Sequence, residues 1–255
     1  MRVRAVAALV VGLSLTLTGC SAGAEPPSDS SGGELTVFAA ASLSGAFDQL
    51  ASGFEAAHPG ADVRPITYDG SSVLATQLLE GASADVFASA DERTMTKVTD
   101  TALAGDAAPF ATNTLEIAVA PGNPLAVTGL DSLADSELII VLCTADVPCG
   151  AASQNLMEAA GITITPSSEE QNVTAVLSKV KSGEADAGLV YRTDIQAAGK
   201  EATGVEIASA DDFVNVYPIV SLADAPNPAL AAAFVDYVLS PTGQKVLASF
   251  GFGAP

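Results

Sequence analysis

The sequence predicts an α/β protein of two lobes, each built on a mixed, mainly parallel sheet flanked by helices. Extended apolar segments and amphipathic segments alternate along the chain from residue 35 onward. Such alternation is typical of parallel sheets with right-handed crossovers. Two further apolar stretches, 115–120 and 214–220, interrupt it. We interpret them as two crossings between lobes, which make a hinge and leave a cleft.

The first lobe is expected to contain residues 34–114 and 219–255. Its first helix places Ala46, Phe47, Leu50 and Phe54 on one face, a spacing that indicates a buried side. Pro65 lies inside a strand expected over 63–68, which indicates an edge position or a bulge because proline cannot donate to a sheet ladder. The remaining elements expected here are strands at 35–38 and 85–88, a helix from 71 to 81, and two helices at 228–239 and 241–250 that end the chain.

The second lobe is expected over residues 115–218. Glycines follow two amphipathic segments, at Gly161 and Gly183, where they are typical of helix C-termini. The expected elements are strands at 138–142 and 187–191 and helices at 151–160 and 173–181. Ligands of open α/β sheets bind beyond the carboxyl ends of the strands. The two lobes therefore predict a ligand site in the cleft between them.

The N-terminal segment predicts export. Arg2 and Arg4 precede a short apolar run, and Leu17-Thr18-Gly19-Cys20 then resembles the lipobox of bacterial lipoproteins. That resemblance implies a signal peptide over 1–19 and acylation of Cys20, which would anchor the protein to the outer face of the cell membrane. Residues 20–33, rich in Ser, Gly and Pro, predict a flexible tether. The alternative is an ordinary secretory signal with a free Cys20.

The charge balance excludes a nucleic-acid partner. The chain has 30 acidic and 10 basic residues, a formal charge of −20. Both arginines of the signal segment are lost on cleavage, so the chain from Cys20 onward has a charge of −22. Such a chain repels phosphate backbones and anionic lipid. We expect a monomer, and a globular one, since 49% of residues are hydrophobic.

Cys143 and Cys149 are six positions apart in a chain expected to be exported, where disulfides persist. We expect a bridge between them, with two reduced thiols as the alternative. A metal pair is disfavoured because His58, the single histidine, is far away in sequence. A secreted hydrolase is disfavoured too, since His58 lies in no recognisable nucleophile motif and the chain has no Gly-x-Ser-x-Gly elbow or zinc signature.

Four short segments, most of which contain Gly or Ser, lie at the start of stretches whose apolar residues recur with the spacing of a helix. They are Ala41-Ser42-Leu43-Ser44, Gly70-Ser71-Ser72, Val147-Pro148-Cys149-Gly150 and Asn172-Val173-Thr174. The first turn of a helix has N–H groups without intrahelical partners and a partial positive charge. Several such turns at one point would bind an anion without Lys or Arg, so the pattern predicts an oxyanion receptor. The alternative is that Ser42, Ser71 and Asn172 are plain N-caps.

Five stretches carry a family resemblance: 37–43, 81–91, 147–150, 188–191 and 250–252. Together they resemble the molybdate-binding proteins of bacterial ABC importers, over nearly all of the chain after the tether. The resemblance implies the type II periplasmic binding protein fold, a non-catalytic role, no cofactor, and delivery of molybdate or tungstate to a membrane permease. It places the ligand contacts on Ser42, Ser71, Cys149, Val173 and Tyr191, with molybdenum bound only as the oxyanion and no direct protein–metal ligand.

The chain departs from the commonest family pattern at Cys149, where a small residue such as Ala is usual. Because only the backbone N–H of this residue is needed, binding stays plausible. Two other functions remain open at this point. One is a receptor for another tetrahedral oxyanion such as sulfate or phosphate, and the other is a surface lipoprotein that binds no ligand.

Overall fold

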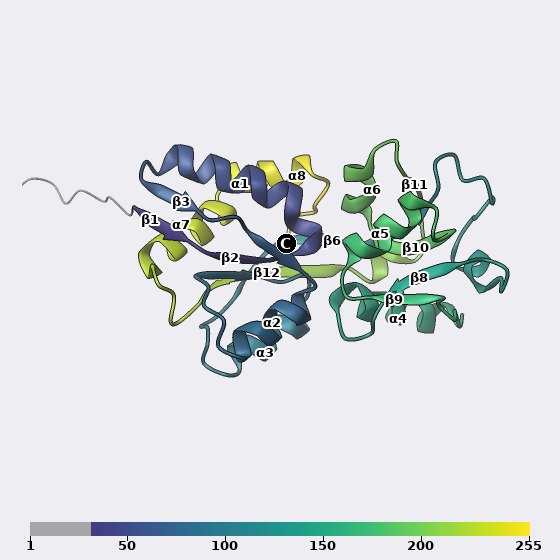
Figure 1. Cartoon of the computed structure of the whole chain (residues 1–255), viewed down its shortest axis with the longest axis horizontal. Helices are drawn as coiled ribbons and strands as arrows, with labels where there is room; N and C mark the ends of the chain where they lie inside the picture. The colour runs from purple at the N-terminus through teal and green to yellow at the C-terminus, as the bar shows by residue number, and fades with distance from the viewer. Residues whose placement is uncertain (1–31) are drawn as a thin grey trace, which may run out of the picture.

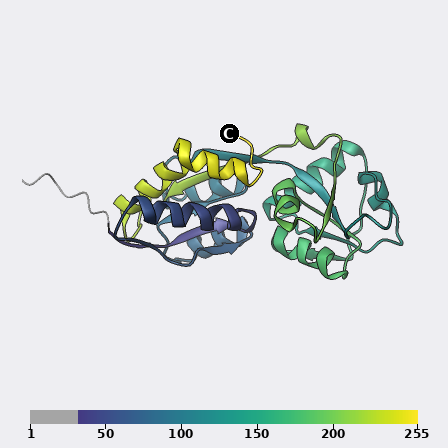
Figure 2. The same cartoon turned by 90° about the horizontal axis from the view of Figure 1, so that it is seen from above.

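The computed structural model describes residues 32–255, so the predicted signal peptide, Cys20 and most of the tether lie outside the described residues. Two bodies lie side by side along the long axis of the molecule and are joined by extended segments (Figures 1 and 2). We call them lobe 1, residues 32–113 and 215–255, and lobe 2, residues 114–214. Each lobe has its own mixed sheet flanked by helices, as predicted, and each of these sheets has five strands.

The main sheet of lobe 1 has the order β4-β2-β5-β12-β6. Its strands are β2 (Val37–Ala40), β4 (Thr67–Asp69), β5 (Val86–Ala88), β6 (Ala108–Asn113) and β12 (Asn215–Ser221). Strand β2 is parallel to β4 and β5, whereas β12 is antiparallel to β5 and β6. The helices are α1 (Ser44–Ala57), α2 (Ser71–Leu79), α3 (Glu92–Thr99), α7 (Pro228–Leu239) and α8 (Pro241–Ser249), with a 3-10 turn η1 (Ala41–Leu43) before α1.

Lobe 2 repeats this mixed arrangement in the order β11-β7-β10-β8-β9. Its strands are β7 (Leu115–Val119), β8 (Ile140–Cys143), β9 (Ser168–Glu170), β10 (Ala187–Tyr191) and β11 (Thr203–Val205). Strand β8 is parallel to β9 and β10, and β7 is antiparallel to β10 and β11. The helices are α4 (Pro148–Ala160), α5 (Val173–Ser182) and α6 (Arg192–Ala198), and 3-10 turns lie at Leu130–Ala134 and Ala210–Asp212.

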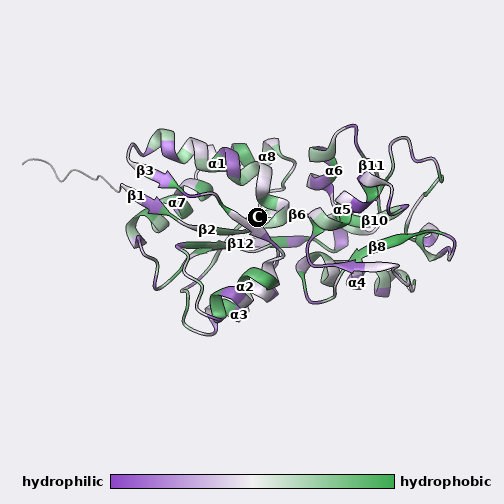
Figure 3. Ribbon diagram, viewed as in Figure 1, coloured by the Kyte–Doolittle hydropathy of each residue, from purple (hydrophilic) through white to green (hydrophobic). Residues whose placement is uncertain are grey.

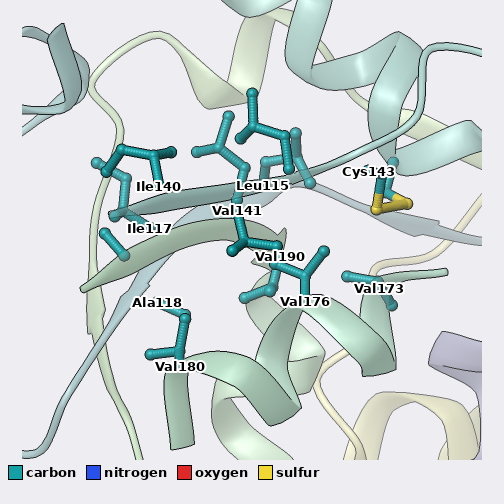
Figure 4. Packing of buried hydrophobic residues seen from close by; sticks show 14 of the residues in the cluster. Leu115, Ile117, Ala118, Ile140, Val141, Cys143, Val173, Val176, Val180 and Val190 are labelled. Atoms are coloured by element: carbon teal, nitrogen blue, oxygen red, sulfur yellow. A yellow bond between two sulfur atoms is a disulfide. The ribbon is translucent and has the colours of Figure 1, made fainter. Parts of the chain in front are cut away.

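The two lobes have cores of different composition. In lobe 1 the buried rings of Phe47, Phe54, Phe110 and Phe234 pack on one another at tilted or edge-on angles, the arrangement that aromatic pairs prefer. The core of lobe 2 is mainly aliphatic, and Figure 4 shows Ile140, Val141, Val176 and Val180 packed between its sheet and helices. In Figure 3 the apolar colour follows central strands such as β2 and β8, whereas β1 and β3 have the hydrophilic colour and the helices alternate, as amphipathic helices should.

The chain crosses between the lobes at two adjacent points. The first crossing is Thr114, between β6 and β7, and the second comes just before Asn215, where β12 begins. Asn113 and Asn215 face each other in the β6–β12 ladder, so the crossings lie side by side. Strand β12 therefore joins the lobe 1 sheet four residues before the expected boundary at 219. The ladder shifts register between Tyr217 and Pro218, which accommodates a proline inside this central strand.

The expected single strand over 63–68 is wrong. Strand β3 (Ala61–Val63) pairs with β1 (Gly33–Leu35) in a separate two-stranded sheet, and β4 starts only at Thr67. Pro65 lies in the break, where its missing N–H costs no ladder hydrogen bond. Strand β4 lies at the edge of the main sheet, and its C-terminal end leads directly into the cleft.

The last two helices return to lobe 1, as expected. Leu230, Phe234 and Val238 of α7 and Leu247 of α8 are buried in the same core as α1. Gly161 and Gly183 end α4 and α5 in the left-handed conformation, with φ of 67° and 76°. Among the helices that the structure describes, none has the length and apolar character needed to cross a bilayer.

Candidate functional site

A small cavity lies between the lobes, with about 210 Å3 of space including the part open to solvent. The volume of the cavity proper is only about 10 Å3, far below the roughly 300–1,000 Å3 of sites for drug-sized ligands, so it suits nothing larger than a small ion. All five residues that the resemblance singled out line it. The full lining is Ala40, Ala41, Ser42, Asp69, Gly70, Ser71, Ala90, Pro148, Cys149, Asn172, Val173 and Tyr191.

Four helix starts converge on this cavity. Ser42 lies in η1, Ser71 is the first residue of α2, and Val173 is the first residue of α5. Helix α4 starts at Pro148, whose ring nitrogen has no hydrogen, so its first N–H donor is that of Cys149. The N–H groups of a first helical turn have no intrahelical acceptor and carry partial positive charge. The convergence therefore makes the cavity attractive to anions.

The hydroxyl groups of Ser71 and Tyr191 are held so that they can donate into the cavity. Ser71 Oγ accepts a hydrogen bond from the Ala90 N–H at 2.9 Å. Tyr191 Oη accepts one from Asn215 Nδ2 at 3.2 Å, and Asn215 in turn donates to the Ala90 carbonyl. Accepting these bonds does not occupy the hydroxyl hydrogens, so each of the two hydroxyls can also donate to a ligand.

A hydrogen-bonded chain also holds the Ser42 hydroxyl. Asn113 Nδ2 donates to Tyr217 Oη at 3.4 Å, and Tyr217 Oη lies 3.0 Å from Ser42 Oγ. Either hydroxyl can be the donor in the Ser42–Tyr217 hydrogen bond, so Ser42 can donate to a ligand when Tyr217 donates to it. Asn113 also donates to Thr193 Oγ1 of lobe 2, at 2.8 Å. The chain thus connects the hinge to the cavity.

Both phenols remain protonated at neutral pH. Burial raises the pKa of Tyr191 well above its ordinary value of 10, and nearby Tyr217, Asp91 and Asp194 raise it further. Burial likewise raises the pKa of Tyr217, and Asp194 adds to this effect. Hydrogen bonds with Ser42, Asn113 and Tyr191 lower the pKa of Tyr217, but the effect of burial is larger. Tyr191 therefore acts as a hydrogen-bond donor and not as an anion.

A disulfide joins Cys143, at the end of β8, to Cys149, in the first turn of α4. Both cysteines are buried, and their Cα atoms lie 5.8 Å apart. Figure 4 shows the bridge at the edge of the lobe 2 core beside Val173. The bridge ties the strand end to the helix start, so it fixes the loop that presents the Cys149 N–H to the cavity.

One carboxylate in the lining was not expected from the sequence. Asp69, at the end of β4, accepts the Gly70 N–H at 2.7 Å and the Asn172 side-chain amide at 2.8 Å, both through Oδ1. Asp85 and Asp91 lie outside this lining. Asp91 caps α3 by accepting the Thr94 N–H, and Asp85 accepts the backbone N–H groups of Thr36 and Asn227. Within residues 32–255 no group of three His, Cys, Asp or Glu side chains could hold a metal ion.

Sequence reasoning missed Asn113, Asn215 and Tyr217, which orient the donors without lining the cavity. One signal was present, because Asn215 and Tyr217 are two apart on a strand and so share one face of the sheet. A polar residue on the buried face of an apolar strand needs partners. Of the predicted capping residues, Asn172 does cap α5 through Ala175 N, at 2.9 Å, whereas Ser42 and Ser71 lie within their helical turns and cap nothing.

Two α/β lobes that meet around a small donor-lined cavity define a two-lobed ligand-capturing protein. The bacterial extracellular solute-binding protein family matches residues 35–253. The chain belongs to this family. Its members bind solutes rather than transform them, in agreement with the predicted absence of catalysis.

Named relatives and a solved structure agree with this membership. The chain is 45% identical over 222 residues to the molybdate-binding protein of Mycobacterium tuberculosis, covering 87% of this chain and 85% of that one. It is 29% identical over 246 residues to a putative ABC transporter substrate-binding lipoprotein of Bacillus subtilis, covering 94% of both. The periplasmic molybdate-binding protein of Azotobacter vinelandii has the same fold, with a TM-score of 0.75 at 24% identity over 87% of this chain and 99% of that one. The predicted periplasmic-binding-protein fold is thereby confirmed.

Proposed function

We propose that this protein captures molybdate, and also tungstate, in the cavity between its lobes and delivers it to the membrane permease of an ABC importer. The observation that carries the proposal is the set of three hydroxyls that line the cavity, those of Ser42, Ser71 and Tyr191, of which Ser71 and Tyr191 accept from protein donors. A fully deprotonated tetrahedral oxyanion presents only acceptors, so it matches this set. The M. tuberculosis relative, named as a molybdate-binding protein, supports the choice of ion.

Affinity without a lysine or arginine in the site is physically reasonable. Each hydrogen bond to a charged group contributes about 1.5–3 kcal/mol. Three hydroxyls and two backbone N–H groups then give a gross gain of order 10 kcal/mol, before the costs of desolvation and closure. Although the protein is strongly acidic, salt screens its long-range field over about 8 Å. Local dipoles therefore decide affinity inside the closed cavity.

We also propose that the chain is processed at Cys20 and held at the membrane surface by a lipid there. The lipobox-like sequence supports this, as does the similarity to a Bacillus subtilis protein named as a lipoprotein. Mass spectrometry of the membrane-associated protein tests it. A diacylglyceryl modification on an N-terminal Cys20 is the expected result, and an unmodified Cys20 would contradict it.

A titration panel tests the ligand. Molybdate, tungstate, sulfate and phosphate are each added to the purified protein, and heat release and thermal unfolding are measured. A ligand at 100 times its dissociation constant stabilises the folded state by about 2.7 kcal/mol. We expect molybdate and tungstate to bind and to raise the unfolding temperature. If sulfate or phosphate binds more tightly than molybdate, that ion is the ligand instead. If none of the four ions gives a response, the protein does not bind an oxyanion.

A further inference from the structure

The cavity is bordered on one side by a contact between the lobes that involves two adjacent residues of lobe 1, Asp69 and Gly70. Asp69 Oδ1 accepts the Asn172 side-chain amide across the cleft, at 2.8 Å. The same oxygen accepts the Gly70 N–H within lobe 1. Asn172 uses its other end, Oδ1, to cap α5. One carboxylate oxygen therefore connects the helix start that carries Ser71 with the helix start that carries Val173.

Gly70 is required at this contact for a steric reason. A Cβ atom at this position would lie 2.1 Å from the Gln171 carbonyl oxygen and 3.2 Å from Val147 Cγ1, and both of these residues belong to lobe 2. The backbone angles of Gly70, φ −57° and ψ 132°, suit any residue. Within lobe 1 alone, a residue with a side chain would therefore fit at position 70. Glycine is needed there only when the two lobes are in contact.

Neighbouring contacts continue along the same side of the cleft. Ser72 Oγ donates to the Asp146 carbonyl, and Arg93 Nη2 donates to the carbonyls of Asp146 and Ala145. All of these acceptors are backbone atoms of the loop between β8 and α4, which leads into the helical turn that contains Cys149. The N-terminal ends of α2 and α3 in lobe 1 thus hold the loop that presents a ligand donor from lobe 2.

We propose that Asp69 and Gly70 are positioning residues for ligand capture: they form a latch that holds the lobes closed around the oxyanion and sets how slowly it is released. The proposal rests on the proposed function for the identity of the guest, but the closure itself applies to any small oxyanion that fits the cavity. A carboxylate close to a bound dianion repels it. The latch gives Asp69 a favourable role in closure that offsets this repulsion.

The test compares three variants with the unmodified protein and a matched control. Gly70→Ala inserts a methyl group into the contact, Asp69→Ala removes the shared acceptor, and Asp69→Asn keeps an acceptor oxygen while removing the charge. Gly105→Ala is the control, because a Cβ there meets no atom within 4 Å. For each protein we measure the unfolding temperature without ligand, the affinity and release rate of molybdate, tungstate, sulfate and phosphate, and the ligand-induced compaction by X-ray scattering.

We expect Gly70→Ala to unfold at the temperature of the unmodified protein and Asp69→Ala slightly below it, because the latter also loses the acceptor of the Gly70 N–H. Both should bind about tenfold more weakly or worse, with faster release. In Asp69→Ala this is the loss expected for one charge-assisted hydrogen bond, and in Gly70→Ala it comes from the clash of the added methyl group. Gly70→Ala should also compact less. Asp69→Asn should retain most of the affinity, and Gly105→Ala all of it.

Several results would overturn the latch. Tighter binding by both Asp69 variants would mean that charge repulsion dominates, and equal affinity and compaction in Gly70→Ala would mean that closure does not need the glycine. Failure of molybdate alone, with normal closure on another of the four ions, would overturn the proposed ligand and leave the latch measured with that ion. Absence of compaction of the unmodified protein with all four ions would overturn the latch as well.

Discussion

Lobe 1 and lobe 2 line the same cavity by different chemical means. Lobe 1 offers side-chain hydroxyls at Ser42 and Ser71, each held by a hydrogen bond with another protein group. Lobe 2 offers the backbone N–H groups at Cys149 and Val173, and its one side-chain hydroxyl is that of Tyr191. Side-chain donors depend on residue identity, whereas backbone donors depend on how the helix start is held. The comparison teaches that the two halves of the site should respond differently to mutation.

The largest expected effect separates the hydroxyl donors from the backbone donors. The double variant Ser42→Ala, Ser71→Ala loses two hydrogen bonds to a charged group, so molybdate binding should weaken by about 3–6 kcal/mol, or more than a hundredfold. Val173→Ala keeps its N–H, so its affinity should change by less than about threefold although a buried side chain is truncated. Calorimetry measures both, with the exposed Ser52→Ala as control. Equal losses in the double variant and Val173→Ala would remove the distinction.

The next effect concerns a buried carboxylate of lobe 2 beside the hinge. Asp194 accepts the Tyr191 N–H at 2.9 Å, and burial raises its pKa from 3.8 to about 7. Between pH 4 and 7 the unfolded chain has released this proton while the folded protein retains it, so the free energy of unfolding should fall as pH rises. The slope contributed by this group approaches about 1.4 kcal/mol per pH unit and vanishes above the folded pKa.

Denaturant unfolding from pH 4 to 8, with Asp194→Asn alongside, checks this sign. Asparagine keeps an acceptor for the Tyr191 N–H and does not ionise, so the pH dependence should be flatter in the variant. A variant with the same pH profile as the unmodified protein would mean that Asp194 is ionised across the range. No residue lining the cavity is altered, so molybdate affinity at pH 5 serves as the control and should be retained.

The smallest of the three expected effects concerns the disulfide that holds the Cys149 N–H of lobe 2 in place. Replacing Cys143 and Cys149 together by Ala opens a short covalent loop, and the free energy of unfolding should fall by about 2 kcal/mol in the chain-entropy model. Affinity should fall by only a few-fold, because the Cys149 N–H remains but its loop is freer. Intact mass with and without reductant verifies the bridge in the parent. An affinity loss as large as that of the serine variant would show that the bridge, and not the helix start, places this donor.

Local patterns were sufficient to predict most elements of the fold. The alternation of extended and amphipathic segments placed the main strands and helices, and the apolar stretches at 115–120 and 214–220 marked the crossings. Local patterns failed at residues 63–68, where β-rich composition suggested one strand. Two different sheets compete for that segment, and Pro65 permits the break between β3 and β4. The pairing partners of a short strand lie far away in sequence, so composition alone could not decide between them.

By itself, the sequence determined which residues begin helices, and therefore where unpaired N–H groups occur, because capping and helix geometry are local properties. Only the tertiary structure decided which atoms those donors meet and how the hydroxyls are turned. Ser42 and Tyr217 are 175 positions apart, and Asp69 and Asn172 are 103 apart. Their hydrogen bonds depend on the packing of two sheets and on closure of the lobes, which no local spacing encodes. Five residues of the cavity lining could thus be proposed from the chain, whereas their orientation and the contact between Asp69 and Asn172 arise only when the two lobes meet.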